Sequence, residues 1–494
     1  MNRSIEYWQA KSERLNFEGR AFIDGKYVDS ISRKTFPCVN PATGKEIARI
    51  AECDRADVDL AVSIAKQRFD SGAWAKRSPT ERKNVLLKLA ALIQENMEEL
   101  ALLESLDMGK PVEVSFAYEM PELAGYVQWV AEAVDKLYDE VAPTGQGDLA
   151  LIRREALGVV ACVVPWNFPL DMAVWKCVPA LAMGNSVVLK PAEQSSLTAI
   201  KLAELVKAAG VPDGVFNVVT GFGETVGASL GLHMDVACLA FTGSTEVGKY
   251  FLKYSAESNM KLVWLECGGK SPNIVFADTE NLDQAAELAA RVFYNQGEVC
   301  SSPTRLLVEE SIHDDFVARV IKYAESYEPA DPLDPNCLMG SLVESVHTQR
   351  VMQYVEAGKA EATLAYGGEQ VEINGSSNFI RPTIFTGVTN EMRIAKEEIF
   401  GPVLSIIKFS SEEEAVQIAN DSIYGLMASV FTSNLSRAHR VSEALKAGTV
   451  TVNTVDMISP LVPFGGVKQS GNGRDNSLHA FEKYSSLKTT WIKY

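Results

Sequence analysis

Cys300 and Glu266 are the two side chains whose setting in the sequence favours chemistry over packing. Cys300 lies in the segment YNQGEVCSSPTR (residues 294–305), among small and polar residues. Glu266 lies in VWLECGGK, where it follows an apolar run that is typical of a buried strand and precedes two glycines. A nucleophilic thiol with a general base nearby indicates covalent catalysis through a thioester intermediate.

Each of these residues also has an ordinary structural interpretation. A single cysteine in a chain without a disulfide pattern is commonly an inert, small apolar residue. A glutamate beside glycines is commonly a turn or cap residue. The catalytic interpretation therefore depends on further elements of the site.

Asn167 supplies a third polar group. It lies in PWNFP (residues 165–169), which closes an apolar strand over residues 159–164. The two prolines restrict the backbone on either side, and the amide can donate to an oxyanion that develops during a reaction. The alternative is that the side chain only caps a turn.

A phosphate site is indicated by a strand over residues 237–241 that runs into TGSTEVG. Gly243, Ser244 and Gly248 open a helix there, and backbone N–H groups together with the helix dipole favour an anion. The spacing is GxxxxG, which differs from the GxGxxG of the standard dinucleotide motif, so an ordinary strand-to-helix turn is the alternative.

Lys190 and Glu193 follow the first strand of a βαβ unit formed by residues 186–190, 196–209 and 215–220. The carboxyl end of such a strand is where a ribose-binding group is expected. A solvated Lys–Glu ion pair is the alternative interpretation of these two residues.

The composition is that of an ordinary globular protein, with 494 residues of which 47% are hydrophobic. This length favours two or three domains. Short apolar runs that alternate with helical stretches predict an α/β protein with parallel strands. Residues 78–79 open a long amphipathic helical segment that ends near residues 109–111.

The net charge of −17 makes nucleic acid and anionic membranes unfavourable partners. The eight cysteines form no CxxC pair and the five histidines form no ligand pattern, so we predict neither a metal site nor a disulfide framework. The N-terminus lacks the apolar core of a signal peptide, and the longest apolar run is too short to span a bilayer. We therefore expect a soluble, cytoplasmic protein with reduced thiols.

Seven motifs, taken in chain order, resemble those of the aldehyde dehydrogenase superfamily: PWNFP, KPAE, FTGSTEVG, LECGGK, the Cys300 segment, EEIFGP (residues 397–402) and PFGGVKQSG (residues 463–471). The resemblance runs from about residue 22 to the C-terminus. Within the superfamily the chain most resembles bacterial γ-glutamyl-γ-aminobutyraldehyde and guanidinobutyraldehyde dehydrogenases, through FEGRAFI, SNMKLVWLE and KQSGNGRDNSLHAFEKY.

The resemblance implies a role for each polar group. Cys300 matches the nucleophile, Asn167 with the Cys300 backbone N–H matches the oxyanion donor, and Glu266 matches the base that activates water. NAD is implied as cofactor because Glu193 would repel a 2′-phosphate; Lys190 could offset part of that repulsion, so NADP is possible but less favoured. The positions that match the cofactor site are Pro165, Trp166, Lys190, Glu193, Gly223, Gly243, Ser244, Val247, Glu398 and Phe400.

The resemblance also places two carboxylates, Glu122 and Asp171, at substrate-tunnel positions that many relatives fill with apolar residues. Acidic groups in an aromatic-lined tunnel suit a cationic tail. We therefore predict an ω-amino, γ-glutamylamino or guanidino aldehyde from amine or polyamine catabolism. Alternatively, Glu122 is an exposed helix residue and Asp171 pairs with an internal Lys or Arg. The other tunnel positions are Trp175, Tyr294, Ser301, Ile458 and Phe464.

Two residues near the catalytic positions depart from the family pattern. Glu298 stands where Gln is common, and Cys267 replaces an aliphatic residue. A carboxylate turned toward the thiol would disfavour the thiolate, so we expect Glu298 to point away from Cys300.

Three other functions stay open at this stage. They are broad-specificity oxidation of aliphatic or aromatic aldehydes, acyl transfer to coenzyme A or phosphate, and a non-catalytic structural role on the same fold. Relatives that transfer the acyl group tend to lack a base at the Glu266 position. The presence of Cys300, Glu266 and Asn167 argues against a catalytically silent protein.

The fold implied is a Rossmann-like, doubly wound NAD-binding domain with an α/β catalytic domain and a small β element for bridging and oligomerisation. We expect residues 1–138 and 157–265 in the first, 266–467 in the second, and 139–156 with 468–494 in the third. The alternating C-terminal segment KTTWIKY has no obvious partner within its own domain. It therefore favours pairing across subunits in a homo-oligomer, a dimer or tetramer.

Overall fold

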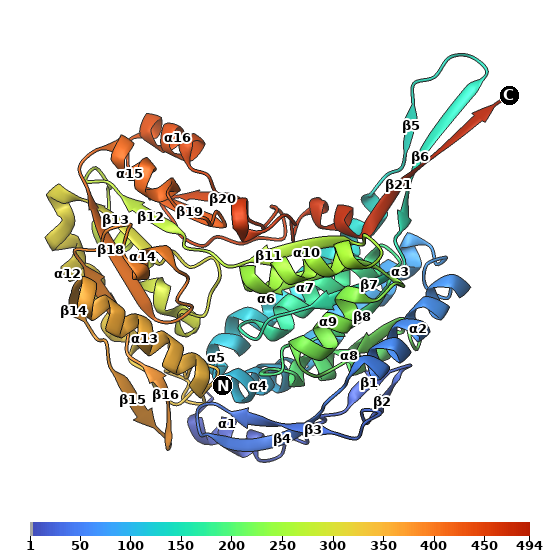
Figure 1. The fold of residues 1–494 in the computed structure, drawn as a ribbon, viewed down its shortest axis with the longest axis horizontal. Coiled ribbons are helices and arrows are strands. Elements are labelled where there is room, and N and C mark those ends of the chain that lie inside the picture. The colour runs from blue at the N-terminus through green and yellow to red at the C-terminus, as the bar shows by residue number, and fades with distance from the viewer. Residues whose placement is uncertain (1–2) are drawn as a thin grey trace.

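The computed structural model describes residues 3–494, which form two α/β halves and a long arm that projects from one of them (Figure 1). Each half is built on a seven-stranded sheet, and the arm is a three-stranded sheet. The predicted fold class, two α/β units with mainly parallel strands and a small β element, is confirmed.

The sheet of the first half has the order β11-β10-β7-β8-β9-β1-β2. Five strands are parallel, and the hairpin β1-β2 adds an antiparallel edge. All residues of β7 and β8 are buried, as expected for parallel strands covered on both faces. The strands are β1 (Ala21–Ile23), β2 (Lys26–Val28), β7 (Val159–Val163), β8 (Ser186–Lys190), β9 (Phe216–Val218), β10 (Val236–Gly243) and β11 (Leu262–Cys267).

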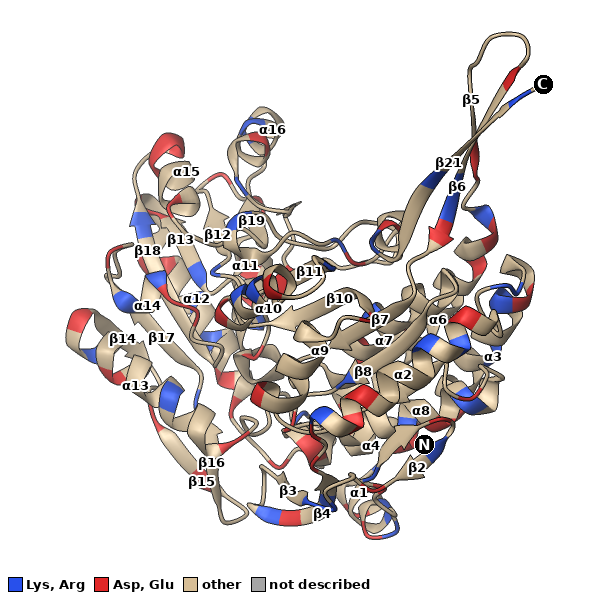
Figure 2. Ribbon diagram, turned by 45° about the vertical axis from the view of Figure 1, so that its right-hand side comes forward, with Lys and Arg blue, Asp and Glu red and all other residues tan. Residues whose placement is uncertain are grey.

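Helices cover both faces of this sheet. Val160 and Leu189 belong to one hydrophobic core and their neighbours Val159 and Val188 to another, because successive residues of a strand face opposite sides. The first core is completed by α3 (Pro79–Glu95), α6 (Met120–Ala133), α7 (Pro169–Ala182) and α8 (Leu197–Ala209), and the second by α2 (Arg55–Ser71), α9 (Ala228–Leu232) and α10 (Thr245–Glu257). Figure 2 shows that charged residues lie mainly on helices and loops, whereas β7 and β10 carry none.

The chain order creates a crevice at the carboxyl edge of this sheet. Strands β7, β8 and β9 follow one another in one direction, and β10 then returns to the opposite side of β7. The loops that leave β7 and β10 diverge at this switch point, where open parallel α/β sheets bind their ligands. These loops carry PWNFP and TGSTEVG.

The sheet of the second half has the order β14-β17-β18-β13-β12-β19-β20 and is parallel except for β14. Its strands are β12 (Pro272–Val275), β13 (Arg305–Glu309), β14 (Thr363–Tyr366), β17 (Thr383–Thr386), β18 (Val403–Phe409), β19 (Met427–Phe431) and β20 (Thr449–Val452). The helices of this half are α11 (Leu282–Ala290), α12 (His313–Ala324), α13 (Ser345–Glu361), α14 (Arg393–Lys396), α15 (Glu412–Asn420) and α16 (Leu435–Ala444).

The arm pairs the C-terminus with an internal hairpin. Strand β21 (Ser485–Lys493) runs antiparallel to β6 (Asp148–Ala156), which pairs in turn with β5 (Glu140–Ala142). KTTWIKY therefore has a partner in its own chain, and β21 and β5 form the two outer edges of the arm. The remaining elements include α1 (Ile5–Ser12), α5 (Val112–Val114) and the hairpins β3 (Thr35–Asn40) with β4 (Lys45–Ala51) and β15 (Gln370–Ile373) with β16 (Ser376–Ile380).

The amphipathic segment that starts at residues 78–79 is two helices and not one, which corrects the prediction. Helix α3 begins with a capping box between Ser78 and Glu81 and ends at Asn96, and α4 (Met97–Met108) follows directly. The Asn96 side chain donates to the Leu92 carbonyl at 2.7 Å, and such a local bond competes with continuation of the helix. Within residues 3–494, no helix has the length and apolar character needed to cross a membrane.

Candidate active site

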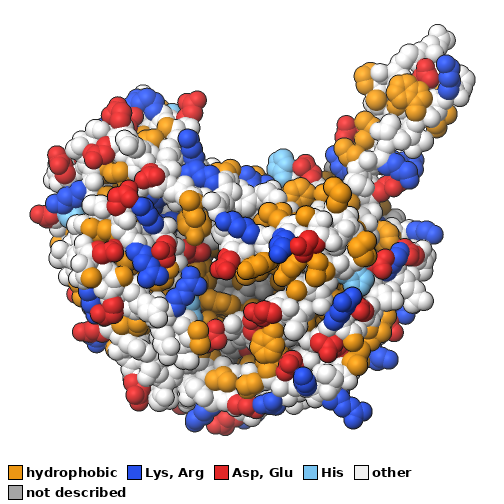
Figure 3. Space-filling model, viewed as in Figure 1, with side chains coloured by type: hydrophobic (Ala, Val, Ile, Leu, Met, Phe, Trp, Pro, Cys, Tyr) orange, Lys and Arg blue, Asp and Glu red, His pale blue; other side chains and the backbone are white. Residues whose placement is uncertain are grey.

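A cavity of about 1190 Å³ is lined by residues of both halves at the carboxyl edge of the first sheet. Figure 3 shows a hollow at the centre of the molecule, seen from the same side as in Figure 1, with hydrophobic and acidic side chains around it. Pockets for one small ligand commonly measure about 300–1,000 Å³. The cavity therefore has room for a cofactor and a substrate together.

Cys300 lies on the loop between η4 (Arg291–Gly297) and β13, and it lines the cavity. Just before it, Asn295 and Gln296 have left-handed φ values of 47° and 57°, a strained conformation that clusters at functional sites. A Cβ atom on Gly269 would lie 2.6 Å from the Cys300 carbonyl oxygen. Glycine is therefore needed where β11 ends, so that the cysteine loop can approach.

Burial raises the pKa of the Cys300 thiol above its usual range. The negative charges of Asp456, Glu398 and Glu266 act in the same direction, in that order. The thiol is therefore protonated at neutral pH in this state of the protein.

Asn167 joins the PWNFP loop to the cysteine loop. Its Nδ2 donates to the Glu298 carbonyl at 2.8 Å, and Asn295 Nδ2 donates to the Asn167 carbonyl at 3.0 Å. The Asn167 amide has a second hydrogen, and the residue lines the cavity together with Cys300. The loop thus holds an amide donor at the wall of the cavity.

The Glu298 side chain is fully buried and, among residues 3–494, does not line the cavity. Its Oε1 accepts from the Val343 N–H at 3.1 Å. The expectation that this carboxylate turns away from the thiol is confirmed, because its hydrogen-bond partner lies on the segment that leads into α13.

Glu266 is the penultimate residue of β11 and is 3% exposed. Neither carboxylate oxygen has a hydrogen-bond partner in the described part of the chain. A Cβ atom on Gly465 would lie 2.6 Å from its Oε1, so the carboxylate packs against the PFGG segment. Burial raises the pKa of Glu266 well above its usual range, and the charge of Asp475 adds to this. An unpaired buried carboxyl group of this kind marks a functional site.

A buried charge cluster lies next to Glu266. The Asp475 carboxylate accepts from both Lys176 and Lys483, and all three side chains are at most 4% exposed. The two lysines lower the pKa of Glu266 and so offset part of the effect of burial. Lys176 and Asp475 are 299 residues apart in sequence.

Six of the ten predicted cofactor residues line the cavity: Pro165, Trp166, Gly243, Ser244, Glu398 and Phe400. Ser244 caps α10, since its hydroxyl accepts from the Val247 N–H at 3.2 Å. Glu398 Oε1 accepts from the Gly269 N–H at 3.0 Å, and burial raises the pKa of this carboxyl group to about 7. The rings of Trp166 and Phe400 meet edge to face at 5.2 Å.

The other four predicted cofactor residues lie beyond the cavity wall. Lys190 Nζ pairs with Glu193 Oε2 at 3.2 Å, so the ion pair foreseen as an alternative does form. The Glu193 side chain is 30% exposed and still accessible to a ribose. A Cβ atom on Gly223 would meet nothing within 4 Å, and Val247 is 41% exposed. Val247 belongs to the first turn of α10, where a helix N-terminus can receive a phosphate.

All seven predicted substrate residues line the cavity: Glu122, Asp171, Trp175, Tyr294, Ser301, Ile458 and Phe464. Aromatic rings form much of its wall. Trp175 meets Phe464 at 5.5 Å and Tyr126 at 6.0 Å, and Phe168 stacks on Tyr294 at 6.4 Å.

Asp171 has no ion pair with a Lys or Arg among residues 3–494, and its Oδ2 is buried without a hydrogen-bond partner. The nearby Lys110 pairs instead with Glu104 at 2.9 Å and with Glu119 at 2.7 Å. The internal ion pair of Asp171 that was left open is therefore not observed. Glu122 is an exposed residue of α6 and also part of the cavity wall.

The sequence pattern of the aldehyde dehydrogenase family matches residues 27–490. The NADP/NAD-dependent aldehyde dehydrogenase PuuC of Escherichia coli (strain K12) is 52% identical over 99% of this chain and 98% of its own. The chain belongs to the aldehyde dehydrogenase family.

Solved structures of aldehyde dehydrogenases superpose on nearly the whole chain. An indole-3-acetaldehyde dehydrogenase of P. syringae, in complex with NAD+ and IAA, superposes with a TM-score of 0.99 at 52% identity over 100% of both chains. A gamma-glutamyl-gamma-aminobutyraldehyde dehydrogenase of Burkholderia cenocepacia superposes with a TM-score of 0.98 at 52% identity over 99% of both chains.

Several residues in the cavity of this aldehyde dehydrogenase were not predicted from the sequence. They come from distant segments, and only the last of them lies in a segment that carries the resemblance: Glu119, Tyr126, His347, Asp456 and Asp475. The His347 ring packs against both Trp166 and Phe400, and burial lowers its pKa to about 4, so it is neutral.

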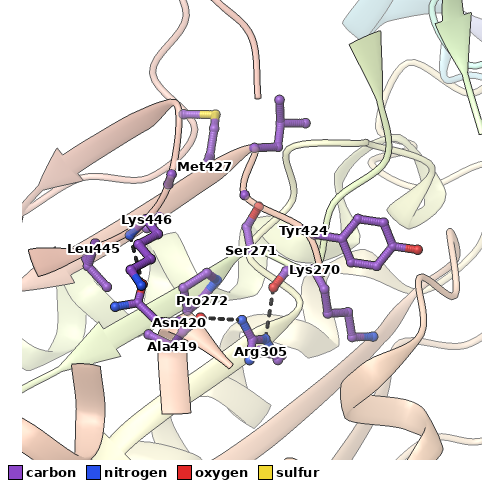
Figure 4. A pocket seen from close by; sticks show the side chains of 14 residues that line it. Lys270, Ser271, Pro272, Arg305, Ala419, Asn420, Tyr424, Met427, Leu445 and Lys446 are labelled. Carbon is purple, nitrogen blue, oxygen red and sulfur yellow. Dashed lines mark hydrogen bonds between the residues drawn. The ribbon is translucent and has the colours of Figure 1, made fainter. Parts of the chain in front are cut away.

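A second cavity, of about 10 Å³, is lined in part by Lys270, Ser271 and Pro272, the segment that follows β11 (Figure 4). There the Arg305 guanidinium donates to the carbonyl oxygens of Lys270, Ile418 and Ala419. The Lys270 ammonium points away from Arg305 (Figure 4). This cavity holds at most one water molecule, and its Arg305 bonds tie the segment after β11 to the second half.

Proposed function

We propose that this aldehyde dehydrogenase oxidises ω-amino, γ-glutamylamino or guanidino aldehydes to carboxylic acids, with NAD as the preferred oxidant. The observation that carries the proposal is the buried, unpaired Oδ2 of Asp171 in an aromatic-walled cavity that also contains Cys300. A cationic tail would supply the partner that this oxygen lacks. Two relatives of this chain have names that support this substrate class. They are an aminoacetaldehyde dehydrogenase of Pseudomonas aeruginosa and the gamma-glutamyl-gamma-aminobutyraldehyde dehydrogenase of Burkholderia cenocepacia.

The local charge favours Asp171 over its neighbours as the tail-binding group. Lys110 and the Tyr294 hydroxyl, which donates to Glu119 at 2.6 Å, already satisfy the Glu119 carboxylate. Burial raises the pKa of Asp171 well above its usual range, and the charges of Glu119 and Glu104 reinforce this. A bound cation would stabilise the ionised form of Asp171, because opposite charges attract strongly where water is excluded.

The reaction would proceed at Cys300. The thiol first loses its proton to solvent. The thiolate sulfur then attacks the aldehyde carbon and forms a C–S bond, while the carbonyl π bond opens to an oxyanion that accepts from the amide of Asn167 and the Cys300 N–H. NAD, when bound, accepts the hydride that leaves this carbon. Glu266 then takes a proton from water, whose oxygen attacks the resulting thioester and releases the acid and the thiol.

The residues at the predicted cofactor positions support the binding of a dinucleotide. Ser244 and the first turn of α10 would hold phosphate, and the Glu398 carboxylate would accept from the nicotinamide ribose. Glu193 would accept from the adenosine ribose, and its charge would disfavour a 2′-phosphate there. Lys190 is buried and already paired with Glu193, which limits its ability to attract that phosphate.

Oxidation of aromatic aldehydes is the second candidate function. It is favoured by the contact between Trp175 and Phe464, which would accept a flat apolar ring as readily as an alkyl chain. The P. syringae structure is described as an indole-3-acetaldehyde dehydrogenase. Asp171 distinguishes the two candidates, because an aromatic tail would leave its Oδ2 unpaired.

We expect Asp171→Asn to raise KM for guanidinobutyraldehyde about tenfold relative to an alkanal of similar length, because one charge-assisted hydrogen bond is lost. The raised pKa of Asp171 adds a pH signature: KM of the unaltered enzyme for this cation should fall as the pH rises and Asp171 ionises. Initial rates with NAD and with NADP measure both effects and the cofactor preference.

Glu122→Gln serves as the control, since Glu122 is exposed at the cavity mouth and its charge is screened by solvent. We expect it to change KM for the cationic aldehyde less than Asp171→Asn does. Equal losses for guanidinobutyraldehyde and the alkanal in Asp171→Asn would contradict the proposed tail recognition and favour the second candidate.

We also propose that the first sheet with residues 1–138 and 157–265 forms the NAD-binding domain, and that residues 139–156 and 468–494 join subunits. The arm exposes Val141, Leu487 and Trp491, each more than 60% exposed, on a sheet with two outer edges. Such apolar, unpaired edges favour association. We expect sedimentation to give a dimer or tetramer of the 53.9 kDa chain, and a monomer at micromolar concentration would contradict this.

A further inference from the structure

Asp456 is a carboxylate beside the nucleophile that neither the sequence motifs nor the proposed mechanism uses. It lies between β20 and Phe464 and lines the cavity. Its Oδ1 is buried and has no hydrogen-bond partner in residues 3–494. Its backbone is left-handed, with φ of 49°, a conformation that costs free energy for a residue other than glycine and persists where the surroundings enforce it.

Asp456 acts electrostatically on the reacting sulfur and is influenced by the residue next to it. The side chain of Ser301, the residue directly after Cys300, favours the ionised form of Asp456 and lowers its pKa against the larger effect of burial. Among the charged groups that raise the pKa of the Cys300 thiol, Asp456 has the largest effect. Within residues 3–494, the cation that most affects its carboxyl group is Arg291, an exposed residue that also lines the cavity.

Asp171 belongs to a separate group of charges. The charges with the largest effects on its carboxyl group are those of Glu119, Glu104, Lys110 and Glu122. Among the residues that the structure describes, three carboxylates of the cavity have an unpaired buried oxygen: Glu266, Asp171 and Asp456. With Glu266 as the proposed base, Asp171 and Asp456 are left for cationic groups, and Asp456 is the one that acts on the Cys300 thiol.

The length of the substrate decides which carboxylate can be reached. When the aldehyde carbon is bonded to Cys300, an ammonium group on the next carbon or one carbon further stays close to the sulfur and to Ser301. An ammonium or guanidinium group four or more carbons away extends beyond this region. A short aminoaldehyde bound at Cys300 would leave Asp171 without its cation, so recognition of its charge needs a nearer group.

We propose that Asp456 is a second cation-binding residue of the tunnel, which recognises short aminoaldehydes whose ammonium group lies on the first or second carbon from the carbonyl. The proposal rests on the aldehyde oxidation at Cys300 described above, and it extends the substrate class from long to short tails. Asp456 would accept from the ammonium group through its unpaired Oδ1, and the Ser301 side chain would favour the ionised carboxylate.

The test compares two matched pairs of aldehydes, aminoacetaldehyde with propanal and guanidinobutyraldehyde with an alkanal of similar length. We expect Asp456→Asn to lower the ratio of kcat/KM for aminoacetaldehyde to that for propanal about tenfold, as for the loss of one hydrogen bond to a charged group. Any change in thiol ionisation affects both members of a pair equally and cancels in the ratio. The ratio for the long pair should stay within about twofold, since the long tail extends past this residue.

Asp171→Asn provides the reciprocal control and should lower the ratio of the long pair only. Asp456→Glu keeps the charge and should retain a preference for aminoacetaldehyde above that of Asp456→Asn. Equal ratios in Asp456→Asn and the unaltered enzyme would overturn the role of Asp456, as would an unaltered enzyme that shows no preference for aminoacetaldehyde over propanal. An unchanged ratio for the long pair in Asp171→Asn would instead contradict the role of Asp171, so the two proposals fail separately.

Discussion

Replacement of Cys300 by Ala is expected to abolish NADH formation with every aldehyde, with a fall in kcat of about 10⁴-fold or more, because the thioester of the proposed mechanism forms on this sulfur. The fall should be the same for aminoaldehydes and alkanals, since the nucleophile acts before any difference in tail is relevant. NADH absorbance in the steady state, with a sensitive fluorescence assay for the residual rate, measures the effect.

The matched control is Cys337→Ala, a buried cysteine of the second half whose Sγ lies 3.2 Å from the Met339 carbonyl and outside the cavity wall. It should keep near-normal activity and should still be labelled at Cys300 by iodoacetamide. Retention of more than a few per cent of activity in Cys300→Ala would show that the nucleophile lies elsewhere.

The state of the thiol adds a pH dependence to this prediction. Burial, followed by the charges of Asp456, Glu398 and Glu266, raises the pKa of Cys300, so the reactive thiolate is scarce at neutral pH. Labelling of the free enzyme by iodoacetamide should therefore speed up as the pH rises from 7 to 9. A labelling rate that is independent of pH in this range would contradict the protonated thiol.

Replacement of Glu266 by Gln is expected to separate the two halves of the reaction. Rapid mixing with NAD and aldehyde should give a burst of about one NADH per Cys300, followed by a steady state about 10²–10⁴-fold slower than that of the unaltered enzyme, as for the loss of a general base. The thioester should then accumulate, and mass spectrometry of the quenched protein should detect the acyl group on Cys300.

The physical reason lies in the buried carboxyl group. Burial and then the charge of Asp475 raise the pKa of Glu266, so only its deprotonated fraction can take a proton from water. Deacylation by the unaltered enzyme should rise with pH until this group is ionised, and the Gln variant should lose that rise. The two lysines that pair with Asp475 limit the upward shift, because their positive charges favour the ionised Glu266.

Hydroxylamine supplies a chemical control for the Glu266 variant. As a strong nucleophile it can cleave a thioester without a general base, so it should restore turnover of Glu266→Gln and yield the hydroxamate. A variant that shows neither a burst nor rescue would place Glu266 in the first half of the reaction or in folding, and the role of base would be wrong.

The sequence by itself determined the elements and the family. Runs of apolar residues predicted β7, β8, β10 and β11 with errors of one or two residues, because strands buried on both faces need continuous apolar sequence. Helix α8 was predicted over residues 196–209, and Gly210, which adopts a left-handed φ of 110°, ends it. The break between α3 and α4 was missed, since a single Asn bond is too weak a signal in an otherwise continuous apolar pattern.

The motifs also determined the main groups of the candidate site, because each motif lies directly after a strand or on a loop whose backbone needs particular residues. Gly269 permits the approach of the Cys300 loop, and Gly465 permits the packing of Glu266. What the motifs could not determine was which charges surround these groups.

Only the tertiary structure decided those charges. Asp475 lies 299 residues from Lys176 and yet pairs with it beside Glu266, and Glu119 bonds to Tyr294 across 175 residues. Asp456 lines the same cavity as the nucleophile, on a backbone with a left-handed φ that the sequence did not predict. A carboxylate has the same local sequence signal whether it is solvated, paired or left unpaired in a cavity. Its pKa and its use depend on burial and on partners that only the folding of distant segments brings within a few ångströms.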